Sequence, residues 1–113
     1  IDNAVKHRLV DEAIGVALLR NMAYYIASHQ EKTGIAPTRE AQMAKLFGAE
    51  LQQRIAATAL QVFGMEGQAT RAGAPTEQYQ YALLRSVANT IEGGTSEIQR
   101  SVIATRGLGL PRE

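Results

Sequence analysis

The sequence predicts an all-α fold, an up-and-down bundle of about four helices. Apolar residues recur every three or four positions over long stretches, which is the spacing of one helical face. No stretch alternates apolar and polar residues for long enough to predict a strand. The breaks between the long stretches carry glycine or proline, the residues that end helices.

The size and charge of the chain exclude several classes of protein. Its 113 residues hold one domain at most, and they fit a part of a larger one. The 45% hydrophobic and 20% charged residues are typical of a soluble globular domain, which we expect to be cytoplasmic. A net charge of +1 without a basic cluster argues against nucleic-acid binding. The absence of cysteine excludes disulfides and thiolate metal sites. The longest apolar run, residues 16–19, is far too short for a membrane span, and no secretory leader opens the chain.

The first predicted helix covers residues 2–31. It should end near Gly34, which can adopt the left-handed conformation of a helix cap, and Pro37 prevents its continuation. With only Asp2 or Asn3 as a possible cap, the abrupt start indicates that the chain begins inside or just before an element of a longer protein. The apolar positions of this helix are Val5, Leu9, Ile14, Val16, Leu18, Met22, Tyr25 and Ile26.

The second predicted helix begins at Thr38 and runs to about residue 63. The Thr38 hydroxyl is the expected cap, and Glu40 suits the positive end of the helix. Many of its residues are small, which predicts close packing against a neighbouring helix. Gly64 is the expected stop. Residues 64–75, which carry three glycines and Pro75, are predicted to form an ordered loop.

A third helix is predicted over residues 76–89, with Thr76 as its cap. A fourth follows the Gly93-Gly94 break and runs to about residue 106, where Ser96 and Gln99 have the spacing of a capping box. The residues expected to face inward are Tyr79, Leu83, Leu84 and Val87 on the third helix and Ile98, Val102 and Ile103 on the fourth.

The helix start after Gly93-Gly94 is the clearest candidate for a binding site. It offers free amides and two hydroxyls next to residues without side chains, which suits an anion or a phosphate. Taken alone, however, the local pattern favours an ordinary capped helix start. Glu92 precedes the break and is a candidate general base, although a loop carboxylate is more often solvated.

The remaining charged residues give weaker signals. Arg71, Arg85 and Arg100 are candidates for phosphate contacts, or for surface pairs with Glu77 or Glu97. The two histidines, at positions 7 and 29, lie about 33 Å apart along one helix and cannot share a metal ion. We therefore expect no metal site.

Three segments of the chain resemble the C-terminal region of acyl-CoA dehydrogenases. Residues 93–100, Gly-Gly-Thr-Ser-Glu-Ile-Gln-Arg, resemble the C-terminal signature of that family. Upstream, residues 61–67, Gln-Val-Phe-Gly-Met-Glu-Gly, resemble its Gln-x-x-Gly-Gly-x-Gly turn. Residues 43–47, Met-Ala-Lys-Leu-Phe, are similar to the start of the helix that leads to this turn. The resemblance covers nearly the whole chain.

The resemblance implies a flavoprotein that oxidises acyl-CoA to the trans-2-enoyl thioester, with FAD as cofactor and an electron-transferring flavoprotein as acceptor. Residues 1–113 would be part of the C-terminal helical bundle, with the first bundle helix missing. Such bundles form the core of a homo- or hetero-oligomer. The acyl group stays open between a fatty acid, a branched chain and a sterol side chain.

The resemblance also implies roles for individual residues. The turn of Gln61, Val62, Phe63, Gly64 and Met65 would contact the FAD of a neighbouring subunit. FAD of the same subunit would contact Thr95, Ser96 and Glu97, and Gly94 would lie against the substrate.

The chain departs from the family at the catalytic base. Many members carry the glutamate immediately before Gly-Thr-Ser, where this chain has Gly93, and Glu92 falls one residue earlier. Three explanations are open: a base upstream of residue 1, a catalytically silent subunit of a hetero-oligomer, or Glu92 in a remodelled loop. Met65, where the family commonly has glycine, keeps the silent subunit open. A non-enzymatic helical oligomerisation module explains the helical pattern equally well, but not the paired glycine motifs.

Overall fold

The computed structural model describes residues 2–69 and 71–112, and its helices confirm the all-α prediction. The elements are α1 (Asn3–Thr33), α2 (Thr38–Val62), the short 3-10 helix η1 (Gly64–Gln68), α3 (Glu77–Asn89), α4 (Ser96–Val102) and the π-helical turn η2 (Ile103–Gly107). Within the described ranges no residue is assigned to a strand.

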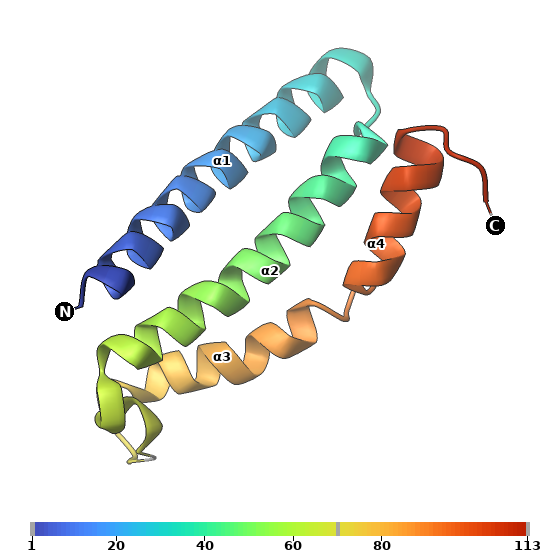
Figure 1. The fold of residues 1–113 in the computed structure, drawn as a ribbon. Helices are drawn as coiled ribbons and strands as arrows, with labels where there is room; N and C mark the ends of the chain where they lie inside the picture. The colour runs from blue at the N-terminus through green and yellow to red at the C-terminus, as the bar shows by residue number, and fades with distance from the viewer. Residues whose placement is uncertain (1, 70, 113) are drawn as a thin grey trace.

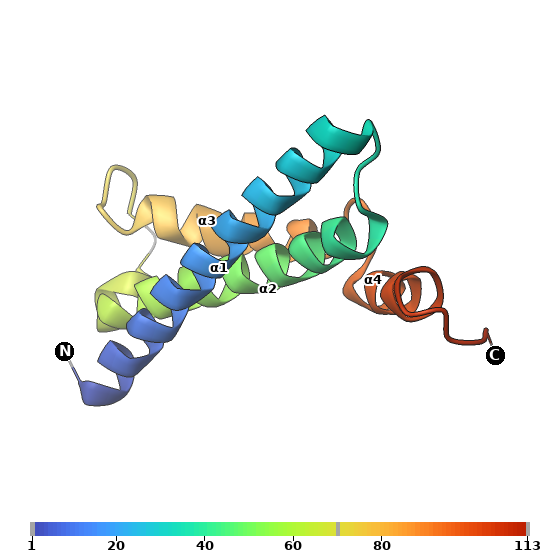
Figure 2. The same ribbon diagram turned by 90° about the horizontal axis from the view of Figure 1, so that it is seen from above.

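Helix α2 is the centre of the bundle. Helix α1 runs back along one side of α2, while α3 and then α4 return along the other side, one after the other (Figure 1). Figure 2 shows that α1 crosses α2 obliquely, and both views place the two ends of the chain far apart. The α3–α4 turn therefore lies beside the middle of α2.

The end of α1 agrees with the sequence prediction. Gly34 has a left-handed φ of 75°, and its N–H donates to the Gln30 carbonyl at 2.8 Å. At the other end, the Asp2 carboxylate accepts a hydrogen bond from the Ala4 amide at 3.2 Å. Both ends are thus capped as local chemistry dictates.

The predicted cap of α2 is wrong, although the helix begins at the predicted residue. Pro37 occupies the cap position, and the Thr38 hydroxyl makes no capping hydrogen bond. Because Thr38 is already the first helical residue, the cap position falls to Pro37, whose side chain has no acceptor for the first-turn amides. Glu40 lies in this turn, and the hydrogen bond from Arg39 lowers the pKa of its carboxyl group.

Close packing of α1 on α2 is confirmed. A Cβ atom on Gly15 would lie 2.9 Å from Leu51 Cδ1, and one on Gly48 would lie 3.2 Å from Leu19 Cδ2. Leu51 is 2% exposed and forms the centre of this contact. Within the same interface the Thr58 hydroxyl donates to the buried Glu12 carboxylate at 2.6 Å.

Part of the predicted loop after α2 is helical. Gly64 has a φ of 59°, and the chain then forms η1 instead of an irregular turn. Gly67 is buried against the end of α2, where a Cβ atom would overlap the Leu60 carbonyl oxygen. Gln80 of α3 donates from Nε2 to the carbonyls of Gly67 and Ala69, both at 2.9 Å. These contacts hold η1 in place.

The predicted inward faces of α3 and α4 are partly wrong. Leu84, Val87 and Ile98 are 75%, 46% and 55% exposed, whereas Ser86 and Gln99 are buried. Each of these short helices packs mainly against α2, so only a narrow strip of each is covered. The buried strip is set by the angle at which the helix meets α2, which apolar spacing alone does not determine.

Candidate functional site

The Gly93-Gly94 turn is held against α2 by two side chains from different parts of the fold. Lys45, from α2, donates from Nζ to the Gly94 carbonyl oxygen at 2.5 Å. Gln99, from α4, donates from Nε2 to the Gly93 carbonyl oxygen at 2.8 Å. Contacts from α2 and from α4 therefore hold the turn between α3 and α4 in place.

Both glycines of the turn are required by the backbone. Their φ values are 68° and 104°, in the region that residues with side chains rarely adopt. A Cβ atom on Gly94 would lie 2.5 Å from Gln99 Nε2. A Cβ atom on Gly93 would meet only the Lys45 side chain, at 3.8 Å from Cε. The side of the turn at Gly93 is consequently open.

The start of α4 keeps two backbone amides available. The Thr95 hydroxyl accepts a hydrogen bond from the Ile98 amide at 3.2 Å, so Thr95 is the cap, not Ser96 as the capping-box spacing suggested. Gln99 is directed back to Gly93 and takes no part in a capping box. The amides of Ser96 and Glu97 have no hydrogen-bond partner among the described residues. Amides at such a position can bind an oxyanion.

Glu92 lies beside this turn in a polar, open environment. Its side chain is 58% exposed and forms an ion pair with Arg85 at 2.8 Å. A base that removes a weakly acidic proton needs a dry pocket that favours its neutral form. In this conformation Glu92 has no such pocket. The expected partners of the arginines also differ, because Arg100 pairs with Glu50 at 2.8 Å.

The second predicted group lies at the far end of α2. The side-chain oxygen of Gln61 accepts a hydrogen bond from Arg8 of α1. The ring of Phe63 packs on Tyr79 of α3, with centroids 5.4 Å apart, and Met65 is 90% exposed. Lys45 and Gln61 are sixteen residues apart on one helix, or about 24 Å at the helical rise. Within one chain, the turn over residues 61–65 and the turn over residues 93–97 therefore lie well apart.

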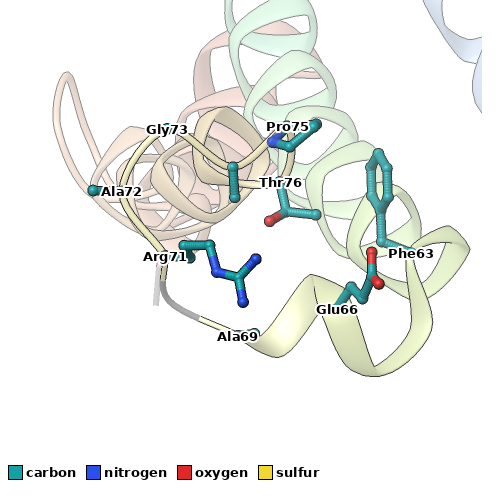
Figure 3. Close-up of a pocket in the computed structure, with 9 residues that line it drawn as sticks. Phe63, Glu66, Ala69, Arg71, Ala72, Gly73, Pro75 and Thr76 are labelled. Carbon is teal, nitrogen blue, oxygen red and sulfur yellow. The ribbon is translucent and has the colours of Figure 1, made fainter.

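A pocket of about 350 Å³ next to Phe63 was missed by sequence reasoning (Figure 3). The side chain of Arg71 points into it, toward Glu66 and Thr76. The loop over residues 71–76 forms its opposite wall. The concentration of Gly, Pro and Arg after residue 64 indicated an ordered loop, but a cavity depends on how that loop folds back on η1.

The titratable side chains of the described residues do not gather into a metal site. Among residues 2–69 and 71–112, no three His, Cys, Asp or Glu side chains cluster closely enough to hold a metal ion. Over the same ranges no helix has the length and apolarity needed to cross a membrane.

The fold and the two glycine-rich turns define an all-α helical-bundle domain. Residues 2–108 match the family described as "Acyl-CoA dehydrogenase, C-terminal domain". The chain belongs to the acyl-CoA dehydrogenase family, which confirms the resemblance carried by its motifs.

Three known proteins are similar to this chain. Two are named "Acyl-CoA dehydrogenase IpdE1", from Mycobacterium tuberculosis (33% identical over 112 residues) and Mycolicibacterium smegmatis (35% identical over 112 residues). A solved structure, that of the "Tcur3481-Tcur3483 steroid ACAD", superposes with a TM-score of 0.83 at 22% identity. Each match covers 99% of this chain, but only 28%, 27% and 30% of the relative. The chain thus spans less than a third of the proteins it matches.

Proposed function

We propose that this chain is part of an FAD-dependent acyl-CoA dehydrogenase that oxidises acyl-CoA to trans-2-enoyl-CoA. Residues 1–113 would be part of the C-terminal bundle, supplying FAD contacts and the oligomer core. The observation that carries the proposal is the pair of family motifs at residues 61–67 and 93–100, each built around a positive-φ glycine next to α2.

The residues of the α3–α4 turn suit contacts to FAD of the same subunit. FAD carries a pyrophosphate, and the free amides of Ser96 and Glu97 are donors of the kind that bind phosphate oxygens. The two glycines themselves add no side-chain atoms to the approach to these amides. When bound, FAD would supply the acceptor for the hydride that leaves the substrate.

The turn over residues 61–65 would contact the FAD of a neighbouring subunit. Its distance of about 24 Å from Lys45 along α2 supports this division, since one bound cofactor need not reach both turns of the same chain. Phe63, Gly64 and Met65 are exposed and hence accessible to a neighbour, while Gln61 is held by Arg8.

We propose that the catalytic base is not supplied by residues 92–94. Gly93 has no side chain at the position of the family glutamate, and Glu92 is exposed and paired with Arg85. The base would come from a part of the full-length protein upstream of residue 1. The second candidate is a catalytically silent subunit whose partner carries the base. The paired designation of the Tcur3481-Tcur3483 protein supports that alternative.

The proposed substrate is the CoA thioester of a steroid-derived acyl group, in preference to a fatty acyl group. The solved relative is named as a steroid ACAD, and its match extends over almost the whole of this chain. An electron-transferring flavoprotein is the proposed acceptor and the cytoplasm the proposed compartment.

The test uses the full-length protein, purified alone and together with any subunit that co-purifies with it. We would measure native mass, visible flavin absorbance and turnover with steroid-derived and straight-chain acyl-CoA, using an artificial electron acceptor. Flavin with turnover by the protein purified alone supports an active subunit, and flavin with turnover only in an assembly that contains the partner supports a silent one. Absence of flavin from every assembly would favour the non-enzymatic module.

A further inference from the structure

We propose that Lys45 is a positioning residue that orients the Gly94–Thr95 peptide, so that its N–H faces the bound cofactor or thioester. Gln99 holds the preceding Gly93–Gly94 peptide in the same way. The inference rests on the proposed function and assigns Lys45 a role that the family motifs around Gly93 do not contain.

The geometry of the peptide unit links the Lys45 contact to the direction of the Thr95 N–H. In a trans peptide the C=O and the following N–H point in opposite directions, and the bonds of this turn are trans. Lys45 Nζ lies 2.5 Å from the Gly94 carbonyl oxygen, so that oxygen is drawn toward α2. The N–H of Thr95 must then point away from α2.

The same reasoning applies one residue earlier. Gln99 Nε2 binds the Gly93 carbonyl oxygen at 2.8 Å, which turns the N–H of Gly94 away from Gln99. Neither the Gly94 amide nor the Thr95 amide has a hydrogen-bond partner among the described residues. Together with Ser96 and Glu97, they form a run of four successive free amides.

The two glycines make it necessary for other side chains to hold the turn in one conformation. Gly93 and Gly94 have positive φ values and no side chains, so they are the most flexible residues of the turn. A hydrogen bond from a charged donor to a carbonyl oxygen is stronger than one from a neutral donor. Lys45 belongs to the long helix α2 and is itself partly buried, which makes it a stable anchor for the turn.

Gln99 is 3% exposed, and its second polar atom, Oε1, is buried without a hydrogen-bond partner among the described residues. An unsatisfied buried acceptor is destabilising. The unsatisfied oxygen is explained if this position requires a glutamine for its Nε2 contact to Gly93. Lys45 and Gln99 therefore have a common effect at this turn: they bind its carbonyl oxygens and leave its amides free.

The ligand that suits this run of amides carries a negatively polarised oxygen. The oxygen can belong to the pyrophosphate of FAD or to the carbonyl of a CoA thioester, and the two sources are separated by measuring each interaction. FAD affinity follows from titration of the apoprotein. Thioester binding follows from the change in the visible flavin spectrum when a non-reactive acyl-CoA analogue is added.

The experiment compares K45M, K45R and the control K6M in the full-length protein with any subunits it binds. Lys6 is exposed on α1 and far from the turn in sequence. We expect K45M to weaken FAD or analogue binding about ten-fold, as for loss of one charge-assisted hydrogen bond. K45R should restore most of the affinity, and K6M should equal the wild type.

The outcomes separate the two proposals. If the wild-type protein binds FAD and K45M binds FAD and the analogue equally well, only the role of Lys45 is overturned. Wild-type protein that binds no FAD in any assembly overturns both proposals. If K45M does not fold, K45Q replaces it. Weaker FAD or analogue binding by K45Q than by K45R supports the ammonium contact, and binding by K45Q equal to that of the wild type overturns it.

Discussion

Gly94 is the residue whose substitution tests the turn most directly. A Cβ atom there would lie 2.5 Å from Gln99 Nε2, at a φ of 104°. We expect Gly94→Ala to lower the free energy of unfolding of the full-length protein by about 1–3 kcal/mol, and to weaken FAD binding. Denaturant unfolding and FAD titration measure these effects.

A control separates backbone strain from the local clash. Gly34 also has a positive φ, 75°, but a Cβ atom there would meet nothing within 4 Å. Gly34→Ala should destabilise the protein and leave FAD affinity unchanged. Equal FAD affinity in Gly94→Ala and the wild type would contradict a binding role for the turn.

Gly93→Glu places a carboxylate at the family position of the base, yet we expect no gain in activity. The new side chain would lie beside Lys45, whose charge favours the ionised carboxylate and lowers its pKa. A thioester base needs a raised pKa instead. The measurement is the exchange of the substrate α-proton in heavy water, with Gly93→Ala as the control for strain. Faster exchange in Gly93→Glu than in the wild type would contradict a lowered pKa of the new carboxyl group.

Thr58 is predicted to stabilise the α1–α2 interface through the buried Glu12. Its hydroxyl donates to the Glu12 carboxylate at 2.6 Å, and Glu12 is 8% exposed. Thr58→Val removes the donor and should lower the free energy of unfolding by about 1–3 kcal/mol. The matched control is Thr105→Val, because Thr105 donates only to the Ser101 carbonyl of its own helix turn. Equal losses in the two variants would refute a specific role for the Glu12 contact.

At the scale of the helices, α1 and α2 depend on close approach at Gly15. A Cβ atom at this position would lie 2.9 Å from Leu51, which is fully buried. Gly15→Leu should push the helices apart and lower the free energy of unfolding by about 2–3 kcal/mol. Ala13→Leu introduces the same leucine side chain at an exposed position of α1 and serves as the control. Thermal unfolding of both variants decides whether the contact is as tight as described.

The ends of the helices were more predictable than their buried faces. Gly34 and Gly64 end α1 and α2 with positive φ values, as their positions in the sequence indicated. Leu84 and Ile98 were expected to be inward and are exposed. A helix end depends on local backbone chemistry, whereas a buried face depends on which neighbour arrives and at what angle.

At the scale of the whole molecule, much apolar surface has no cover within the chain. Helix α1 contacts α2 and no other helix among the described residues, and most of its large apolar side chains are exposed. These residues are Leu9, Val10, Ile14, Val16, Leu18, Tyr24 and Tyr25. The chain spans less than a third of its relatives, so such surface is available to the rest of a longer protein or to other subunits.

This surface leads to a prediction about the 113-residue chain produced alone. We expect it to self-associate and to unfold at a lower temperature than the full-length protein, because exposed apolar area is unfavourable by about 25 cal/mol per Å². Native mass and thermal unfolding of both proteins test this. A stable, monodisperse monomer of the isolated chain would contradict it.

The sequence by itself determined the helical class, the positions of the helix ends and the family. Each of these depends on local patterns: apolar periodicity, glycine and proline at breaks, and motifs within a few residues. Only the tertiary structure decided that Lys45 binds Gly94, that Gln99 binds Gly93 and that Arg85 pairs with Glu92. The Lys45 contact joins residues 49 positions apart, and such a contact exists only once α2 and the α3–α4 turn have packed together. The pocket beside Phe63 arises in the same way, since a cavity is formed by the approach of segments that the sequence alone does not bring together.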